Sequence, residues 1–204
     1  MTEAGRFEKL LRGQCASFVD VSSEVSRVLM RHYELLSQWN KRLNLTGAAT
    51  LEEAVVRHYA ESLFLATLLP KSARRVADLG SGGGFPGFPL AVLRPEVEVV
   101  LVESDQRKAA FLREVSDFAG NIRVRCIRVE SLEGTFDAVV GRAIRPADVL
   151  ATARRIAAGF GILLSRSDAE LLAKSVNSQV WPLPWNPASA ALVGIVPRET
   201  IQAS

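Results

Sequence analysis

The order of apolar and polar residues divides the chain into a helical first part and a second part in which strands and helices alternate. Between Val25 and Trp39, apolar residues recur at the spacing of one helix face: Val25, Val28, Leu29, Leu35, Leu36 and Trp39. A second helix begins at a capping box formed by Thr50 and Glu53 and ends at Pro70, which cannot continue a helix. The apolar stripe of the first helix needs a surface to cover.

After residue 74, short apolar runs typical of buried strands alternate with helical stretches. The runs are 76–80, 97–103, 122–129, 136–141 and 160–165, and the helical stretches are 87–93, 105–119, 146–158 and 168–176. Pro146 suits a first helical position, and Ser167 with Glu170 forms another capping box. The alternation predicts βαβ units with right-handed crossovers, and therefore an α/β fold with a mostly parallel sheet.

The last apolar segment, 180–196, is interrupted by prolines. Because proline cannot donate to a strand ladder, this segment is excluded from a central strand before Ala190. We expect the run that follows Ala190 to form a last strand at the edge of the sheet.

Composition narrows the class of protein. With 204 residues and 48% hydrophobic content, the chain can form one domain with an extension. We expect a helical cap over residues 1–70 and a Rossmann-like domain over 71–204, packed as one compact unit. Cys15 and Cys126 match no metal or redox spacing, and neither a signal peptide nor a membrane span is visible, so we expect a soluble cytoplasmic protein that binds no membrane and no metal. A net charge of +3 does not decide for or against nucleic acid.

A dense glycine segment, 78-DLGSGGGFPG-87, follows the first predicted strand. Ligands of such sheets bind at the carboxyl ends of strands, and so many glycines indicate that backbone approaches a ligand closely. The segment fits the dinucleotide fingerprint from Gly82 to Gly87, and it also fits Asp78-x-Gly80-x-Gly82-x-Gly84. A carboxylate before the first glycine suits a cationic amine and repels a pyrophosphate, which favours S-adenosylmethionine over NAD.

Acidic residues also follow the next two predicted strands. Glu103 ends the run 97–103, where a carboxylate accepts hydrogen bonds from both ribose hydroxyls of either cofactor. Glu130 follows Val129 at the end of the third run, where a loop lies against adenine in such folds. Each residue taken alone is explained by solvation of a loop. Three acidic residues at successive strand ends favour a binding site.

S-adenosylmethionine is a methyl donor, and the motifs that the chain lacks narrow the chemical class of the methyl acceptor. Methylation of an amine calls for an Asn/Asp-Pro-Pro-aromatic motif after the fourth strand, where this chain has 141-GRAIRP-146. Methylation of a pyrimidine carbon needs a cysteine nucleophile, whereas Cys15 and Cys126 fall within a predicted helix and a predicted strand, as buried structural thiols do. A guanine ring nitrogen with a free lone pair requires neither device.

Five segments together resemble a known family: 39-WNKRLNLT-46, 57-RHYAESL-63, 78-DLGSGGGFPGFPLA-91, 107-RKAAFL-112 and 140-VGRA-143. The family is that of the bacterial small-subunit (16S) ribosomal RNA methyltransferases that make 7-methylguanine, also called glucose-inhibited division protein B. The similarity runs from about residue 36 to residue 165. It implies a class I S-adenosylmethionine-dependent methyltransferase with a seven-stranded sheet and a helical N-terminal cap. It also implies a target guanine near the decoding centre of the small subunit.

Carried over residue by residue, the resemblance implies that Gly80, Phe85, Val129, Glu130 and Arg142 contact S-adenosylmethionine. Phe85 either flanks the sulfonium or packs the helix after the glycine turn. The expected cofactor site combines these residues with the rest of the loop and the strand ends: Asp78, Gly80, Ser81, Gly82, Gly84, Phe85, Glu103, Val129, Glu130 and Arg142.

Arg142 is the residue expected to act in the chemistry. A guanidinium at the end of the fourth strand can contact the carbonyl edge of guanine or hold a phosphate. The alternative is a surface arginine that pairs with Glu130 or Glu133. His58 is expected to have no proton-transfer role, since a guanine ring nitrogen needs no base.

Basic residues form an expected RNA footprint. We assign RNA contacts to one polar and five basic residues: Asn40, Lys41, Arg42, Arg107, Lys108 and Arg128. Asn40 also reads well as a turn residue at a helix end. Arg123, Arg125 and Arg128 alternate along 122–129, which an ordinary solvated strand edge also explains.

Departures from the family pattern concern the substrate side. The family usually has His-x-x-Asp-Ser, and this chain has His58, Glu61 and Ser62; Gly141 replaces Ser or Ala. Ser165-Arg166 replaces Lys-Gly at the end of the fifth strand, and 189-SAAL-192 replaces an Arg-x-Leu. Two alternatives therefore stay open: a methyltransferase acting on another RNA or a small molecule, and a nonenzymatic chain that binds RNA or adenosine compounds. A monomer is expected, because the cap already covers one face of the sheet.

Overall fold

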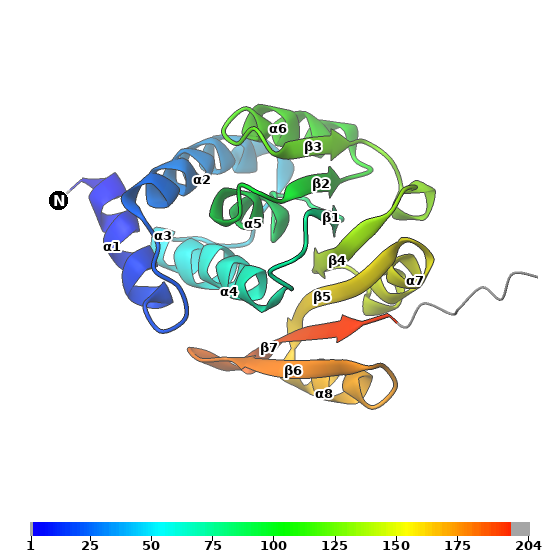
Figure 1. The fold of residues 1–204 in the computed structure, drawn as a ribbon. Helices are drawn as coiled ribbons and strands as arrows, with labels where there is room; N and C mark the ends of the chain where they lie inside the picture. Colours follow the sequence, from blue (N-terminus) through cyan, green and yellow to red (C-terminus); the bar gives the residue numbers. More distant parts are fainter. Residues whose placement is uncertain (1, 197–204) are drawn as a thin grey trace, which may run out of the picture.

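The computed structural model describes residues 2–196 as a seven-stranded sheet with helices on both faces (Figure 1). The strands are β1 (Arg75–Leu79), β2 (Glu98–Val102), β3 (Ile122–Arg125), β4 (Phe136–Arg142), β5 (Ala157–Ser165), β6 (Ser178–Leu183) and β7 (Asn186–Ile195). The α-helices are α1 (Glu3–Cys15), α2 (Ser23–Leu43), α3 (Leu51–Ala54), α4 (Glu61–Leu68), α5 (Gly87–Leu93), α6 (Gln106–Ser116), α7 (Pro146–Ile156) and α8 (Arg166–Ala173). A π-helix, η1 (Val55–Ala60), joins α3 to α4, and a 3₁₀ turn, η2 (Val129–Ser131), follows β3.

The strand order is β3-β2-β1-β4-β5-β7-β6, and β1 to β5 run parallel. β7 is antiparallel to both of its neighbours, β5 and β6. In the middle of the sheet Ala77 of β1 lies between Val100 of β2 and Val139 of β4. The prediction of an α/β fold with a mostly parallel seven-stranded sheet is confirmed.

The C-terminal hairpin corrects the expected position of the last strand. The run that follows Ala190 is not an edge strand, because β7 lies between β5 and β6. The edge is β6, which contains Pro182. A proline costs least at an edge, where one side of the strand has no ladder to complete, as at Pro182. β7 also contains a proline, Pro187, but it precedes Ser189, where the pairing of β7 with β5 begins.

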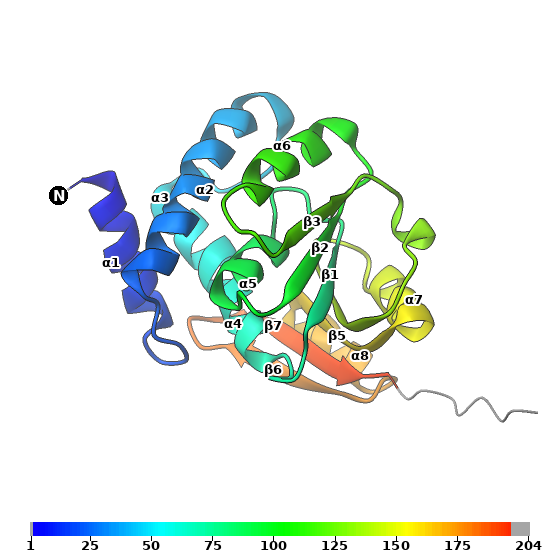
Figure 2. The same cartoon turned by 45° about the horizontal axis from the view of Figure 1, so that its top comes forward.

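Two hydrophobic cores fill the two faces of the sheet. Val76 belongs to the core under α1 to α6, whereas Ala77 and Leu79 belong to the core under α7 and α8, as the two-residue period of a strand requires. Figure 2 shows the cap helix α2 beside α5 and α6 on the first face, with α1 on the outer side of α2. The cap also reaches the C-terminal hairpin, where the rings of Phe18 and Trp185 stack at 5.5 Å. The cap therefore shares a core with the sheet.

Three local predictions are corrected. β3 ends at Arg125, so the strand is shorter than 122–129 and Cys126 lies after it rather than within it. The N-cap of α8 is Ser165, whose hydroxyl accepts a hydrogen bond from the Asp168 amide at 3.1 Å, and not Ser167. Both serines have an acidic residue three positions on, and the earlier one caps because β5 ends there.

The predicted helix starts at Thr50 and Pro146 and both ends of the helix 87–93 are confirmed, whereas the helix expected from Thr50 to Pro70 is divided into α3, η1 and α4. The helices expected over 105–119 and 146–158 end earlier, at Ser116 and Ile156. Thr50 caps α3, and Pro146 stands in the first turn of α7. Among residues 2–196, no helix combines the length and apolar character that a membrane span requires.

Candidate active site

The glycine loop, residues 80–87, joins β1 to α5 and is held against the end of β2. The amides of Gly80 and Ser81 both donate to the carbonyl of Val102, at 2.9 and 3.0 Å. Gly80, Gly82 and Gly84 have φ angles of 70°, 53° and 87°, a region that side chains disfavour. Gly80 and Gly82 are half-buried at the carboxyl end of the central strand, whereas Ser81 and residues 83–87 are buried.

Asp78 fixes the loop from beneath. Its side chain is fully buried, and Oδ2 accepts a hydrogen bond from the Gly87 amide at 3.0 Å. Oδ1 has no hydrogen-bond partner among the described residues. Burial raises the pKa of Asp78 to about 7. This geometry differs from the expectation that the carboxylate meets a cationic amine, since no part of Asp78 is exposed.

Glu103 lies at the end of β2 and contacts the same loop. Oε2 accepts from the Gly82 amide at 3.0 Å, and Oε1 accepts from the Asp105 amide at 2.8 Å. Each carboxylate oxygen retains a second lone pair that can accept a ribose hydroxyl. Val129 and Glu130 lie in η2 after β3, half-buried and exposed respectively. Because β1, β2 and β3 are adjacent and parallel, the glycine loop, Glu103, Val129 and Glu130 all lie on the side of the sheet where these strands end.

Aromatic side chains of the cap pack on the other side of the loop. His32 of α2 is fully buried, with Nε2 at 3.1 Å from the Gly83 carbonyl and Nδ1 at 2.7 Å from the Tyr59 hydroxyl. Phe85 stacks on His58 at 4.9 Å and is almost fully buried. Phe85 therefore packs the loop against the cap, and its expected contact with S-adenosylmethionine stays a prediction.

The buried histidine gives a prediction for the pH dependence of folding. Burial lowers the pKa of His32 from 6.5 to about 3. Between these two pH values the unfolded chain binds a proton at His32 and the folded chain does not. The stabilising contribution is complete above the unfolded pKa and is lost as the pH falls through the window from 6.5 to 3. His58, with a pKa of about 4, acts in the same direction, and Asp78 acts in the opposite one.

We expect His32→Gln to reduce the slope of unfolding free energy against pH by one proton, about 1.4 kcal/mol per pH unit. Urea unfolding near pH 5 measures that slope, and Gln38→Ala on the same helix should leave it unchanged. An unaltered slope in His32→Gln would contradict a neutral buried His32.

A buried ion pair joins the cap to the end of β4. Nη2 of Arg142 lies 3.0 Å from Oε2 of Glu61, and the Arg142 guanidinium also donates to the carbonyl of Arg57. Glu61 is 5% exposed. Burial raises the pKa of Glu61 and lowers that of Arg142, and each partner's charge opposes the shift of the other. The expected alternative for Arg142, a pair with Glu130 or Glu133, is wrong.

The ion pair lines a pocket of about 430 Å³, here called the β4–β5 pocket. Its walls come from η1, α4, the ends of β4 and β5, and the β6–β7 hairpin, and they include Arg57, Glu61, Arg142, Ile144, Ser165 and Ser189. Ile144 lies 3.5 Å from the position that a Gly80 side chain would take, so the pocket adjoins the glycine loop. Two departures from the family pattern, at Ser165 and Ser189, therefore share this pocket.

Some residues of this site were not predicted. In the sequence, Glu61 and Arg57 stand out only as parts of a family motif, and no pattern marks His32. The rare π-helix that presents Arg57 has no sequence signature, whereas the acidic residue in His-x-x-Glu-Ser was a usable signal for Glu61.

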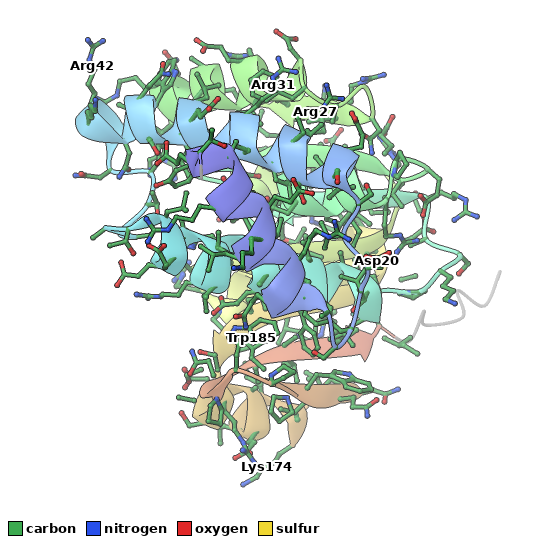
Figure 3. The ribbon with its side chains drawn as sticks, turned by 90° about the vertical axis from the view of Figure 1, so that its left-hand side faces the viewer. Asp20, Arg27, Arg31, Arg42, Lys174 and Trp185 are labelled. Atoms are coloured by element: carbon green, nitrogen blue, oxygen red, sulfur yellow. The ribbon has the colours of Figure 1, made fainter. Side chains whose placement is uncertain are left out.

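The predicted RNA-binding residues separate into two groups. Lys41 and Arg42 at the end of α2 and Arg107 of α6 line one groove with Trp39. This cationic groove brings together residues far apart in sequence, and Arg42 projects from one end of the molecule in Figure 3.

The other predicted RNA-binding residues do not line the cationic groove. Lys108 lies in the first turn of α6, and Arg128 caps η2. Asn40 braces a turn, because its amide exchanges hydrogen bonds of 3.0 and 2.9 Å with the backbone of Thr46. The turn-residue interpretation of Asn40 therefore fits its contacts better than RNA binding.

The strand order, the glycine loop after β1 and the acidic residue after β2 give the chain the class I methyltransferase fold. Magnesium protoporphyrin IX methyltransferase from Synechocystis PCC 6803, solved with bound SAM, has this fold: TM-score 0.57 at 13% identity, over 87% of this chain and 99% of that one. A SAM-dependent O-methyltransferase from Thermotoga maritima gives a TM-score of 0.52 at 17% identity, over 68% and 66% of the two chains.

Sequence comparison narrows the class to one family. Residues 26–164 match the family described as GidB, rRNA small subunit methyltransferase G. The ribosomal RNA small subunit methyltransferase G of Rhodospirillum centenum is 40% identical over 184 residues, 84% of each protein. That of Parvibaculum lavamentivorans is 42% identical over 142 residues, 66% of this chain and 63% of the relative. The chain belongs to the rRNA small subunit methyltransferase G family.

Proposed function

We propose that this chain transfers a methyl group from S-adenosylmethionine to N7 of a guanine in 16S ribosomal RNA, near the decoding centre of the small subunit. The observation that carries the proposal is a pocket with a buried Glu61–Arg142 pair directly beside the glycine loop of a family member. A site for the methyl donor and a pocket for the methyl acceptor thus lie next to each other at the carboxyl ends of the parallel strands.

The residues at the strand ends fit the donor. Gly80 and Gly82 are half-buried and carry no side chain, so their backbone suits close approach, and the spare lone pairs of Glu103 suit the ribose hydroxyls. Ser81 and Gly84 are buried and support the loop; the Ser81 hydroxyl donates to the Asp78 carbonyl. Val129 and Glu130 would flank the adenine. When bound, the donor supplies an electrophilic methyl group on a sulfonium. We assign Asp78 to hold the loop to α5 rather than to touch the donor.

No base or nucleophile is required from the chain. Burial lowers the pKa of His58 to about 4, so its imidazole is neutral near pH 7, and burial raises the pKa of the Cys15 thiol to about 12. The N7 lone pair of guanine can attack directly once it is positioned. Orientation alone can supply about 7–11 kcal/mol of the barrier in favourable cases. We therefore assign Arg142 to the organisation of the acceptor pocket.

The cationic groove is proposed as a contact with the RNA backbone. We expect Arg42→Ala to weaken binding to small ribosomal subunits and to lower the slope of log affinity against log salt by about 0.7–0.9, the effect of one lost phosphate contact. Lys174→Ala is the matched control, because Lys174 is also exposed but lies at the other end of the molecule (Figure 3). Filter binding across a salt series would contradict the groove if both variants gave the wild-type slope.

The proposed partner is the small ribosomal subunit. The proposed location is the bacterial cytoplasm, where ribosomes assemble, and the chain is proposed to act as a monomer. Purified protein with isotope-labelled S-adenosylmethionine should label assembled small subunits from cells lacking it, and digestion should yield 7-methylguanosine. Comparison with naked 16S RNA identifies the form of the substrate. Donor binding without transfer to any RNA would favour a nonenzymatic role.

The serines that replace the family residues favour one alternative, the same chemistry on another RNA or a small molecule. Ser165 and Ser189 line the β4–β5 pocket, so they alter the surface next to Glu61 and Arg142. A different labelled nucleoside, or label in total RNA outside 16S, would support this alternative.

A further inference from the structure

We infer that Glu61 reads the Watson–Crick edge of the guanine that receives the methyl group, and that Arg142 is the positioning residue for its carboxylate. The inference rests on the proposed function and adds the group that selects guanine over other bases. The β4–β5 pocket has a volume of about 430 Å³, which falls within the range of about 300–1,000 Å³ for small-molecule sites.

The carboxylate of Glu61 is fixed on one side and free on the other. Arg142 holds Oε2 at 3.0 Å, while Oε1 makes no hydrogen bond or ion pair with any residue of the described chain 2–196. Glu61 lines the pocket, and Oε1 is not among the buried side-chain atoms that lack a partner, so this oxygen is accessible there. It can accept hydrogen bonds from N–H groups of a ligand that enters the pocket.

Guanine matches this carboxylate better than the other bases do. Its N1–H and N2–H₂ groups are adjacent donors, and a carboxylate accepts two such bonds side by side. Adenine and cytosine present a ring nitrogen acceptor at the corresponding position, and uracil has a single donor between two carbonyls. Enzymes that take a base out of its stack read it by this edge.

The same contact leaves the reacting atom free. Arginine most often reads guanine through O6 and N7, which would occupy the nitrogen to be methylated. In this protein the Arg142 guanidinium is already bound to Glu61 and to the Arg57 carbonyl. The expectation that Arg142 itself contacts the carbonyl edge of guanine is replaced by a contact from Glu61.

Unusual backbone flanks both members of the ion pair. Glu61 directly follows the π-helix η1, and such segments are frequent at functional sites. Ala143, next to Arg142, has a φ of 53°, a left-handed conformation that costs a non-glycine residue about 1–3 kcal/mol. Backbone strain beside the pair is consistent with a site in which the pair's position matters for binding.

The direct test is methylation of small subunits by Glu61→Gln. Glutamine keeps the shape but turns an N–H donor toward guanine, so we expect the kcat/KM for transfer to fall at least about 100-fold, as for two lost hydrogen bonds to a charged group. The dissociation constant for S-adenosylmethionine should stay within about twofold, and Glu61→Asp should recover part of the activity. Glu133→Gln, at an exposed glutamate, is the control.

The outcomes separate the two hypotheses. If the wild-type protein makes 7-methylguanosine and Glu61→Gln does so equally fast, the inference is overturned and the proposed function stands. If the wild-type protein makes none, the proposed function fails. Should Glu61→Gln not fold, inhibition of the wild-type reaction by free nucleotides decides. Guanosine monophosphate should inhibit at a concentration at least about tenfold below that of inosine monophosphate, which lacks the 2-amino group. Equal inhibition would overturn the inference.

Discussion

Replacing Arg142 with alanine should abolish most of the methyl transfer to small ribosomal subunits, with a loss of at least about 100-fold in rate. Glu61 would then be nearly buried without a counter-charge. Breaking a buried ion pair costs about 3–5 kcal/mol. Because 18% of the Arg142 side chain is exposed, we expect the unfolding free energy to fall by the lower value, about 3 kcal/mol. Single-turnover transfer and urea unfolding measure the two effects.

Arg145→Ala is the matched control for Arg142→Ala. Arg145 lies three residues on and pairs with Asp148, but its side chain is 81% exposed, and such surface pairs contribute only about 0–1 kcal/mol. Its activity should equal that of the wild type. If Arg142→Ala transferred methyl groups as fast as Arg145→Ala does, the ion pair would have no part in the reaction.

Replacing Gly87 with alanine should displace the glycine loop and weaken donor binding at least about tenfold, or about 1.4 kcal/mol. An added Cβ would lie 2.5 Å from Cδ2 of Leu101 and 2.7 Å from both Cβ and Oδ2 of Asp78. No side chain can occupy this space unless the loop moves away from β1, which also breaks the hydrogen bond from the Gly87 amide to Asp78. Overpacking of this kind costs about 1–3 kcal/mol of stability.

Gly120→Ala separates this local effect from the general effect of replacing a glycine. A Cβ at Gly120 meets no atom within 4 Å, so stability and donor affinity should remain near wild type. Calorimetric titration with S-adenosylmethionine compares the two variants. Wild-type affinity in Gly87→Ala would mean that the donor does not depend on the loop geometry.

The parallel part of the fold was predictable because its signals are local. Four of the strands from β1 to β5 are short apolar runs, β3 alternates between apolar residues and arginine, and Pro146 marks the start of the connecting helix α7. The end of the sheet was less predictable. Whether β6 or β7 forms the edge depends on pairing with β5, a contact between distant segments that no local pattern encodes.

The site was predictable in position but less so in detail. The glycines and Glu103 predict a ligand site at the ends of the central strands. The glycine loop lies at these strand ends, where the Gly82 amide donates a hydrogen bond to Glu103. The burial of Asp78 and the packing of Phe85 depend on how closely the cap approaches. The pair of Glu61 with Arg142 joins residues far apart in sequence, so only the folded chain reveals that the acidic residue of the motif faces this arginine.

The central claim is that the methyl donor lies on the glycine loop with its reactive methyl group directed toward the Glu61–Arg142 pair. A crystal structure of the protein with S-adenosylmethionine tests this most directly. We predict the ribose hydroxyls at the Glu103 carboxylate, the adenine beside Val129 and the methyl group facing the β4–β5 pocket. A donor bound elsewhere, or one whose methyl group points away from that pocket, would contradict the account.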